Sequence, residues 1–310
     1  MKNSNFADSR LQTNIAGIKM NTPIFTASGT FGFGEEYADF VDLARLGGVM
    51  AKGTTLKPRH GNSGVRITET PMGMLNCIGL ENPGVEVFLN DTLPRIKKYN
   101  MNVIVNISGS TVEEYGILAA MLDVPDVAAI ELNVSCPNVK EGGIVFGTDP
   151  KAAAAVVAAA KKSTKKPVIL KLSPNVTDIC TMAKAVEAAG ADCISLINTL
   201  LGMEININTR KPTLGNITGG LSGACVKPVA LRMVWQVANA VDIPIIGMGG
   251  INSWQDAVEF FLAGADAVAI GTANFTHPAV TMEICDGLNE YLAQNNIENI
   301  ADIVGKIVID

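Results

Sequence analysis

The sequence of 310 residues has few aromatic side chains and no long apolar stretch. Aromatic residues make up 5% of the chain, whereas Gly contributes 30 residues, a balance that many tight strand-to-helix turns would produce. No segment approaches the roughly 20 apolar residues that a transmembrane helix needs. The polar residues 1–10 lack the apolar core of a signal peptide. We therefore expect a cytoplasmic protein that has no membrane association.

The six cysteines are scattered and form no CxxC pair. This distribution predicts neither a zinc site nor an iron–sulfur cluster in the chain, so we expect no metal. Unpaired thiols are typical of a reducing compartment. Four of them lie in apolar or Ala-rich surroundings and are interpreted as packing residues: Cys180, Cys193, Cys225 and Cys285.

Basic residues are also sparse, and the formal net charge is −6. The densest basic run, residues 161–166, is best interpreted as the solvated end of a helix. Nucleic-acid binding needs a basic face or stripe, so we expect no nucleic-acid partner.

Hydrophobic residues make up 48% of the chain and gather in eight short runs. Continuous apolar runs of this length are typical of parallel strands that are buried on both faces. The eight predicted strands are Pro23–Ala27, Gly48–Lys52, Val103–Ile107, Ala128–Leu132, Pro167–Leu172, Cys193–Ile197, Ile243–Gly247 and Ala267–Ile270.

Helical patterns separate most of these runs, including residues 152–162, 178–189, 228–240 and 253–263. Gly190 and Ser253 are suitable capping residues for two of these helices. Repeated strand–helix units predict an α/β fold, a closed (β/α)8 TIM barrel formed by one domain over residues 1–310. A doubly wound open sheet is the alternative. The long connections 57–82 and 200–223 are expected to be functional loops.

Barrel enzymes carry their sites at the carboxyl ends of the strands, so the residues that follow each run are the site candidates. They form a polar ring of amides, hydroxyls and two lysines. The ring has no paired carboxylates, which argues against glycosidase chemistry. A catalytic histidine is not evident either, because His60 lies in a loop and His277 follows the last strand.

Glycine-rich turns follow the last two strands, at Gly249-Gly250 and at Gly271-Thr272. Backbone N–H groups on these two neighbouring turns predict a phosphate site. The phosphate would belong to the substrate or to a cofactor such as FMN. Tight turns without a ligand are the structural alternative.

Lys171 ends an apolar strand, and Lys52 ends another. A lysine at this place can stabilise negative charge at the N1/C2=O edge of a reduced flavin. It can also form a Schiff base in a lyase or an aldolase. Two lysines among several amides indicate a small anionic, amide-rich substrate.

Cys136 is the candidate catalytic base. Its neighbours are polar, and the side-chain amides of Asn133 and Asn138 flank it. An enzyme that removes a proton from a carbon acid needs a base beside groups that hold the substrate. A free thiol has a pKa of about 8.5, so this role needs alkaline pH or local tuning.

Five further stretches of the sequence are distinctive: residues 27–34 (ASGTFGFG), 76–84 (NCIGLENPG), 133–138 (NVSCPN), 220–223 (GLSG) with Lys227-Pro228, and 247–250 (GMGG). Together they resemble the dihydroorotate dehydrogenase family, in the family order and from about residue 10 to the C-terminus. The resemblance implies an FMN-bearing (β/α)8 barrel that makes orotate for pyrimidine synthesis.

The resemblance is strongest to the NAD-linked class, class 1B, through Glu35-Glu36-Tyr37 and residues 139–143 (VKEGG). We do not expect the membrane-linked class, which carries an N-terminal membrane-associating extension and a serine base where this sequence has Cys136. Class 1B implies a homodimer of catalytic subunits that pairs with electron-transfer subunits, α2β2. The electron-transfer subunit carries FAD and a [2Fe–2S] cluster and reduces NAD+. The fumarate-linked class 1A, which has the same type of base, is the close alternative. A phosphate-binding lyase or aldolase that uses Lys171 is the remote one.

The resemblance also implies the roles of individual residues. Cys136 would take the C5 proton of (S)-dihydroorotate while hydride passes from C6 to N5 of FMN. The implied FMN contacts are Ser28, Lys52, Gly53, Asn106, Asn133, Lys171, Ile197, Gly223, Gly249, Gly250, Gly271 and Thr272. The implied orotate contacts are Lys52, Asn76, Gly79, Leu80, Asn133, Asn138, Asn198 and Thr199.

Overall fold

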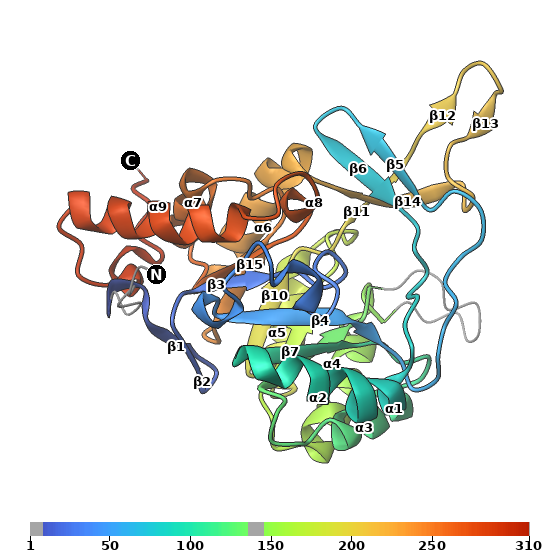
Figure 1. The fold of residues 1–310 in the computed structure, drawn as a ribbon, viewed down its shortest axis with the longest axis horizontal. Coiled ribbons are helices and arrows are strands. Elements are labelled where there is room, and N and C mark those ends of the chain that lie inside the picture. The colour runs from blue at the N-terminus through green and yellow to red at the C-terminus, as the bar shows by residue number, and fades with distance from the viewer. Residues whose placement is uncertain (1–8, 136–145, 310) are drawn as a thin grey trace.

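A closed barrel of eight parallel strands forms the centre of the molecule (Figure 1). The computed structural model describes residues 9–135 and 146–309. Around the barrel the strand order is β10-β15-β16-β3-β4-β7-β8-β9, and β9 pairs with β10 to close the ring. The strands are β3 (Ile24–Thr26), β4 (Gly48–Thr54), β7 (Val103–Ile107), β8 (Ala129–Asn133), β9 (Val168–Lys171), β10 (Cys193–Leu196), β15 (Ile245–Met248) and β16 (Ala267–Ile270).

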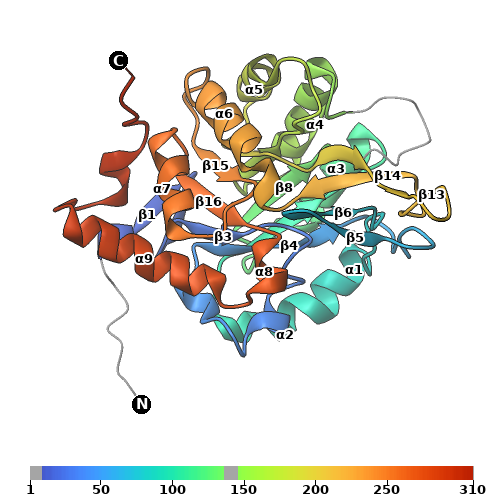
Figure 2. The same cartoon turned by 90° about the horizontal axis from the view of Figure 1, so that it is seen from above.

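Each of the eight apolar runs becomes one barrel strand, so the predicted (β/α)8 barrel is confirmed and the open sheet is wrong. The strands are almost wholly buried because helices cover their outer face and side chains fill the inside. Figure 2 shows the helices arranged around the strands.

The helices are α1 (Val85–Val87), α2 (Leu93–Ile96), α3 (Val112–Met121), α4 (Pro150–Ser163), α5 (Ile179–Ala188), α6 (Lys227–Ala238), α7 (Trp254–Leu262), α8 (Ala273–Thr276) and α9 (Val280–Gln294). A π-helical turn, Phe88–Thr92, joins α1 to α2. The predicted cap of α7 is confirmed, because Ser253 and Asp256 form a reciprocal capping box. Gly190 follows the end of α5 with φ 93°.

The first strand-to-strand connection departs from the repeated strand–helix pattern. Between β3 and β4 the chain forms two 3₁₀ turns, Glu35–Tyr37 and Leu43–Arg45, and no α-helix. Gly29, Gly32 and Gly34 all have positive φ there, at 87°, 55° and 101°. Three such residues within six interrupt a right-handed helical path before it can propagate.

A short antiparallel hairpin of β1 (Thr13–Ile15) and β2 (Ile18–Met20) precedes the barrel and was not predicted. Its side chains Ile15, Ile18 and Met20 pack in one cluster with Phe25 and Met50 from the barrel strands. The hairpin therefore seals an apolar lower part of the barrel interior, opposite the strand ends that carry the polar ring.

The two long connections form an arm of strands that projects from the barrel, away from both termini (Figure 1). They contain β5 (Ile67–Thr70), β6 (Gly73–Asn76), β11 (Leu200–Met203) and β14 (Thr218–Ser222), which form one antiparallel sheet in the order β11-β14-β6-β5. A second hairpin, β12 (Ile205–Asn206) with β13 (Lys211–Pro212), extends it. The expectation of loops missed this sheet, in which β6 of the first connection pairs with β14 of the second.

Three of the four cysteines interpreted as packing residues are buried or half-buried: Cys193, Cys285 and Cys180. The fourth interpretation is wrong, because Cys225 is exposed. It lies in a surface 3₁₀ turn, Ala224–Val226, that leads into α6. Within residues 9–135 and 146–309, no helix is long and apolar enough to cross a membrane.

Candidate active site

Three asparagines predicted at the ends of separate strands meet at the carboxyl end of the barrel. Asn133, at the end of β8, donates from Nδ2 to Oδ1 of Asn106 on β7 at 3.5 Å. Its own Oδ1 accepts from Nδ2 of Asn198 at 3.4 Å, and from the Ser135 N–H at 3.2 Å. Asn198 follows β10, so the amides form a chain across the barrel mouth. Amides in a row provide both donors and acceptors to a planar, amide-rich ring.

Gly53 and Leu80 lie beside this chain. A Cβ atom added to Gly53 would be 3.0 Å from Asn106 Oδ1 and 3.3 Å from Leu80 Cδ2. Lys52, the residue before Gly53 on β4, is half-buried. Leu80 and the end of β4 therefore lie together beside the amide chain.

The arm brings two more predicted residues to this place. Thr199 packs against Gly220, where an added Cβ would lie 2.1 Å from Thr199 Oγ1. Asn76 donates from Nδ2 to the Gly220 carbonyl at 3.3 Å. Gly79 lies against Asn62, whose backbone and side chain are within 2.7 Å of an added Cβ. Close backbone approaches thus hold the predicted orotate contacts in the described part of the chain.

Lys171 is buried at the end of β9, with 5% of its surface exposed. In the strand register it pairs with Asn133 on one side and with Ser195 on the other. No carboxylate among the residues that the structure describes forms an ion pair with its Nζ. A buried ammonium group is costly unless it is compensated, so this residue suits an electron-rich ligand.

The glycine turns after β15 form a tight cradle. Gly250 has φ 77°, and a Cβ there would lie 2.7 Å from both the backbone nitrogen and the Cβ of Lys227, the first residue of α6. Gly249, at φ 123°, approaches Ile197, with 3.3 Å from its added Cβ to Ile197 Cγ1. Only glycine fits such an approach, which leaves the N–H groups of the turn accessible to a phosphate.

The neighbouring turn after β16 is joined to the arm. Thr272 donates from Oγ1 to Ser222 Oγ at 2.8 Å, and Gly223 follows Ser222 directly. A Cβ on Gly271 would meet nothing closer than 3.5 Å. On the adjacent strand end, after β3, Ser28 donates from Oγ to the Ala51 carbonyl at 2.9 Å.

Lys227 is fixed by two carboxylates on α7. Its Nζ lies 2.6 Å from Asp256 and 2.9 Å from Glu259. The hydrogen bonds to Asp256 and Glu259 raise the pKa of Lys227. Burial alone would raise the pKa of Asp256, but the hydrogen bonds from Lys227 and from the Asn252 N–H lower it. The ion pair thus fastens the start of α6 behind the glycine cradle.

Two polar residues at the base of the site were missed by the sequence analysis. Glu131 on β8 accepts a hydrogen bond from Asn106 Nδ2 at 2.5 Å and another from Ser195 Oγ at 2.7 Å. All three side chains are fully buried. The sequence signal for Glu131 is a single carboxylate inside the apolar run at residues 127–132.

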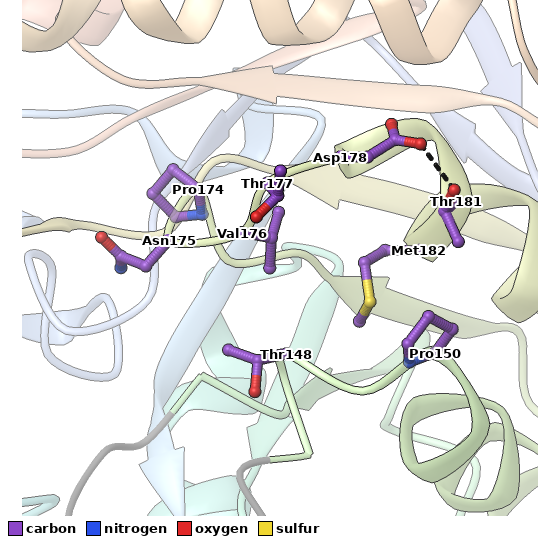
Figure 3. Close-up of a pocket in the computed structure, with 9 residues that line it drawn as sticks. All are labelled: Thr148, Pro150, Pro174, Asn175, Val176, Thr177, Asp178, Thr181 and Met182. Atoms are coloured by element: carbon purple, nitrogen blue, oxygen red, sulfur yellow. Dashed lines mark hydrogen bonds between the residues drawn. The ribbon is translucent and has the colours of Figure 1, made fainter.

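A pocket of about 520 Å³ opens beside the site, between the start of α4 and the loop that follows β9 (Figure 3). In Figure 3, Met182 and Val176 point into the space, and Thr148 faces them. Asn175, another lining residue, donates to the Thr199 carbonyl at 3.0 Å and accepts from the Leu201 N–H at 2.9 Å. The pocket wall is therefore tied to a predicted orotate contact.

Two predicted site residues, Cys136 and Asn138, lie outside the described residues. Ser135, the last residue before that segment, donates its N–H to Asn133.

The residues present fit FMN. The Gly249-Gly250 cradle and the Thr272–Ser222 pair suit a phosphate, while Lys171 and the amide chain suit the edge of an isoalloxazine ring. These features occupy adjoining parts of one barrel end.

A (β/α)8 barrel with phosphate-type turns and a polar ring at the same end is the arrangement of a barrel enzyme that binds a phosphate-bearing ligand. A family model described as "Dihydroorotate dehydrogenase" matches residues 10–292. The chain therefore belongs to the dihydroorotate dehydrogenase family. This assignment leaves the lyase alternative without support.

Curated relatives cover nearly the whole chain. A Bacteroides fragilis protein is 55% identical over 300 residues, which span 96% of this chain and 99% of the relative. A Geotalea daltonii protein is 55% identical over 300 residues, spanning 96% and 98%. A Geobacter sp. (strain M21) protein is 57% identical over 294 residues, spanning 94% and 96%. Each is named "Dihydroorotate dehydrogenase B (NAD(+)), catalytic subunit".

Proposed function

We propose that the chain oxidises (S)-dihydroorotate to orotate in the cytoplasm, as a step of de novo pyrimidine (UMP) synthesis. The observation that carries this proposal is the amide chain Asn106–Asn133–Asn198 beside the buried Lys171, at the barrel end where the Cys136 segment begins. The names of the relatives support the same substrate.

The described residues suit this substrate chemically. Dihydroorotate has a ring of alternating amide N–H and C=O groups and one carboxylate. Asn76, Asn133 and Asn198 provide amide donors and acceptors, and Thr199 adds a hydroxyl. Lys52, half-buried at the end of β4, would neutralise the negative charge.

Cys136 is the proposed base for the C5 proton. It follows Asn133, one of the amides that would hold the ring, by three residues in the sequence, which supports this role. When bound, FMN would supply the acceptor for the hydride from C6. Lys171 would place a positive charge against the flavin edge where negative charge develops. Positioned general-base catalysis contributes roughly 10²- to 10⁴-fold.

The electron acceptor lies outside this chain. We propose that two catalytic chains form a homodimer and that each pairs with an electron-transfer subunit, α2β2, that holds FAD and a [2Fe–2S] cluster and passes electrons to NAD+. The words "catalytic subunit" and "NAD(+)" in the names of the relatives support this assignment over the fumarate-linked alternative, class 1A.

The test is an anaerobic titration of the FMN-loaded chain with dihydroorotate, followed by the visible flavin absorbance. We expect bleaching with release of orotate. Cys136→Ala should slow the bleaching by roughly 10²- to 10⁴-fold, and Cys136→Ser should recover some rate at higher pH. If dihydroorotate does not bleach the bound flavin, it is not the substrate of this chain.

A second assay separates the acceptors. The reduced chain is mixed with fumarate, or with NAD+ in the presence and absence of the electron-transfer subunit. We expect rapid reoxidation by NAD+ only with that subunit present. Rapid reoxidation of the isolated chain by fumarate would favour class 1A.

A further inference from the structure

A buried carboxylate lies directly beneath the amide chain and has no role in the chemistry described above. Glu131 on β8 is 0% exposed and accepts hydrogen bonds through both oxygens, from Asn106 at 2.5 Å and from Ser195 at 2.7 Å. Ser195 is on β10, two strands away around the barrel. The carboxylate therefore bridges the barrel interior instead of bonding along one strand pair.

The carboxylate determines which way the Asn106 amide faces. Because both Glu131 oxygens act as acceptors, the Asn106 atom in contact with it has to be the NH₂ donor. The Asn106 oxygen then faces the barrel mouth, where it accepts from Asn133 and lies 3.0 Å from the position of a Cβ on Gly53. Glu131 thus makes Asn106 present an acceptor, and not a donor, to the site.

Stability alone gives a poor reason for this residue. Taking a carboxylate out of water costs several kcal/mol, and an apolar residue of similar size at such a position is often neutral or stabilising. The inward neighbours below it, such as Ala129 on the same strand and Ile169 on β9, are apolar. A charged group above this apolar layer and below the polar ring is placed where it acts on the site.

The geometry points to Glu131 as a positioning residue for the flavin. It fixes the Asn106 amide with its oxygen toward the isoalloxazine end of the site, and it places a carboxylate behind Asn106. This inference rests on the proposed FMN site. A fixed negative charge disfavours the more electron-rich, reduced form of a nearby flavin, so Glu131 lowers the reduction potential, whereas Lys171 opposes this effect.

The test compares Glu131→Gln with Ser195→Ala, each loaded with FMN. Glu131→Gln removes the charge and lets the Asn106 amide turn over. Ser195→Ala removes the other hydrogen bond to the carboxylate but keeps the charge and the Asn106 contact. The FMN dissociation constant is measured by flavin fluorescence, the two-electron midpoint potential by anaerobic titration with dithionite and a reference dye, and stability by thermal unfolding.

For Glu131→Gln we expect FMN to bind at least tenfold more weakly and the two-electron equilibrium to move at least tenfold toward the reduced form, about 30 mV. Ser195→Ala should change both by less than threefold. If Glu131→Gln does not fold, Glu131→Asp serves instead: it retains the charge but shortens the reach, so FMN binding should weaken at an unchanged potential.

The inference would be overturned if Glu131→Gln kept the wild-type FMN dissociation constant and midpoint potential and differed only in a lower unfolding temperature. Glu131 would then be a structural residue. A potential shift as large in Ser195→Ala would also overturn it. Dithionite reduces the flavin without dihydroorotate. A protein that binds FMN but is not reduced by dihydroorotate would therefore refute the proposed substrate, and the Glu131 comparison would still decide the inference.

Discussion

Replacing Gly250 by alanine tests whether the glycine cradle holds the FMN phosphate. The residue has φ 77°, where an L side chain costs roughly 1–2 kcal/mol. The new Cβ would also lie 2.7 Å from the backbone nitrogen of Lys227. That atom belongs to the first residue of α6 and cannot rotate away, so the cradle and the helix start would have to separate.

Gly190→Ala is the matched control, because it carries the same backbone penalty without the collision. Gly190 has φ 93°, and a Cβ there meets nothing within 4 Å. It should lose roughly 1–2 kcal/mol of unfolding free energy and bind FMN like the wild type. Gly250→Ala should lose at least as much stability. Its FMN affinity should fall tenfold or more, about 1.4 kcal/mol of binding free energy.

The assay is flavin fluorescence during titration of the apoprotein with FMN, with urea unfolding of each variant measured in parallel. Binding is measured without urea, at a temperature at which both variants are folded. The reasoning is refuted if Gly250→Ala binds FMN as tightly as Gly190→Ala. Equal weakening in both variants would contradict it as well, because the loss would then follow stability and not the cradle.

Three further predictions concern the fold and its thiols. Ser253→Ala removes half of the α7 capping box and should cost about 1 kcal/mol of unfolding free energy in urea. Among the described cysteines, Cys225 should react first with maleimide at neutral pH; peptide mapping that finds Cys193 labelled earlier would contradict this. Burial raises the pKa of Cys285 from 9.0 to about 11. The unfolded chain therefore loses that proton first, and unfolding free energy should fall by up to about 3 kcal/mol between pH 9 and 11, a dependence that Cys285→Ala should flatten.

The barrel was predictable because its signal is local and repeated. Every strand is a short apolar run, and burial on both faces makes such a run continuous. The connection between β3 and β4 was not predictable to the same degree. Its residues 35–45 have no glycine and look helical, but the positive φ angles at Gly29, Gly32 and Gly34 appear only once the chain is folded.

The candidate site was predictable where a polar residue ends a strand and unpredictable where polar residues lie within one. Asn133 and Lys171 are the last residues of β8 and β9, so the barrel rule points to them. Glu131 and Ser195 sit among apolar neighbours, and an apolar run reads the same whether its one polar residue faces the interior or a helix. Their partnership is visible only across the closed barrel, between β8 and β10.

The arm shows why the parts of the site depend on each other. Pairing of β6 with β14 joins residues near 75 to residues near 221, a partnership that no local pattern indicates. At Gly220 the sheet contacts Asn76 and Thr199, the predicted orotate side. Two residues further on, Ser222 accepts from Thr272, the predicted phosphate side. Two residues of a strand span roughly 7 Å. One short strand therefore sets the distance between the two ends of the site, and a shift of β14 by one residue would disturb both at once.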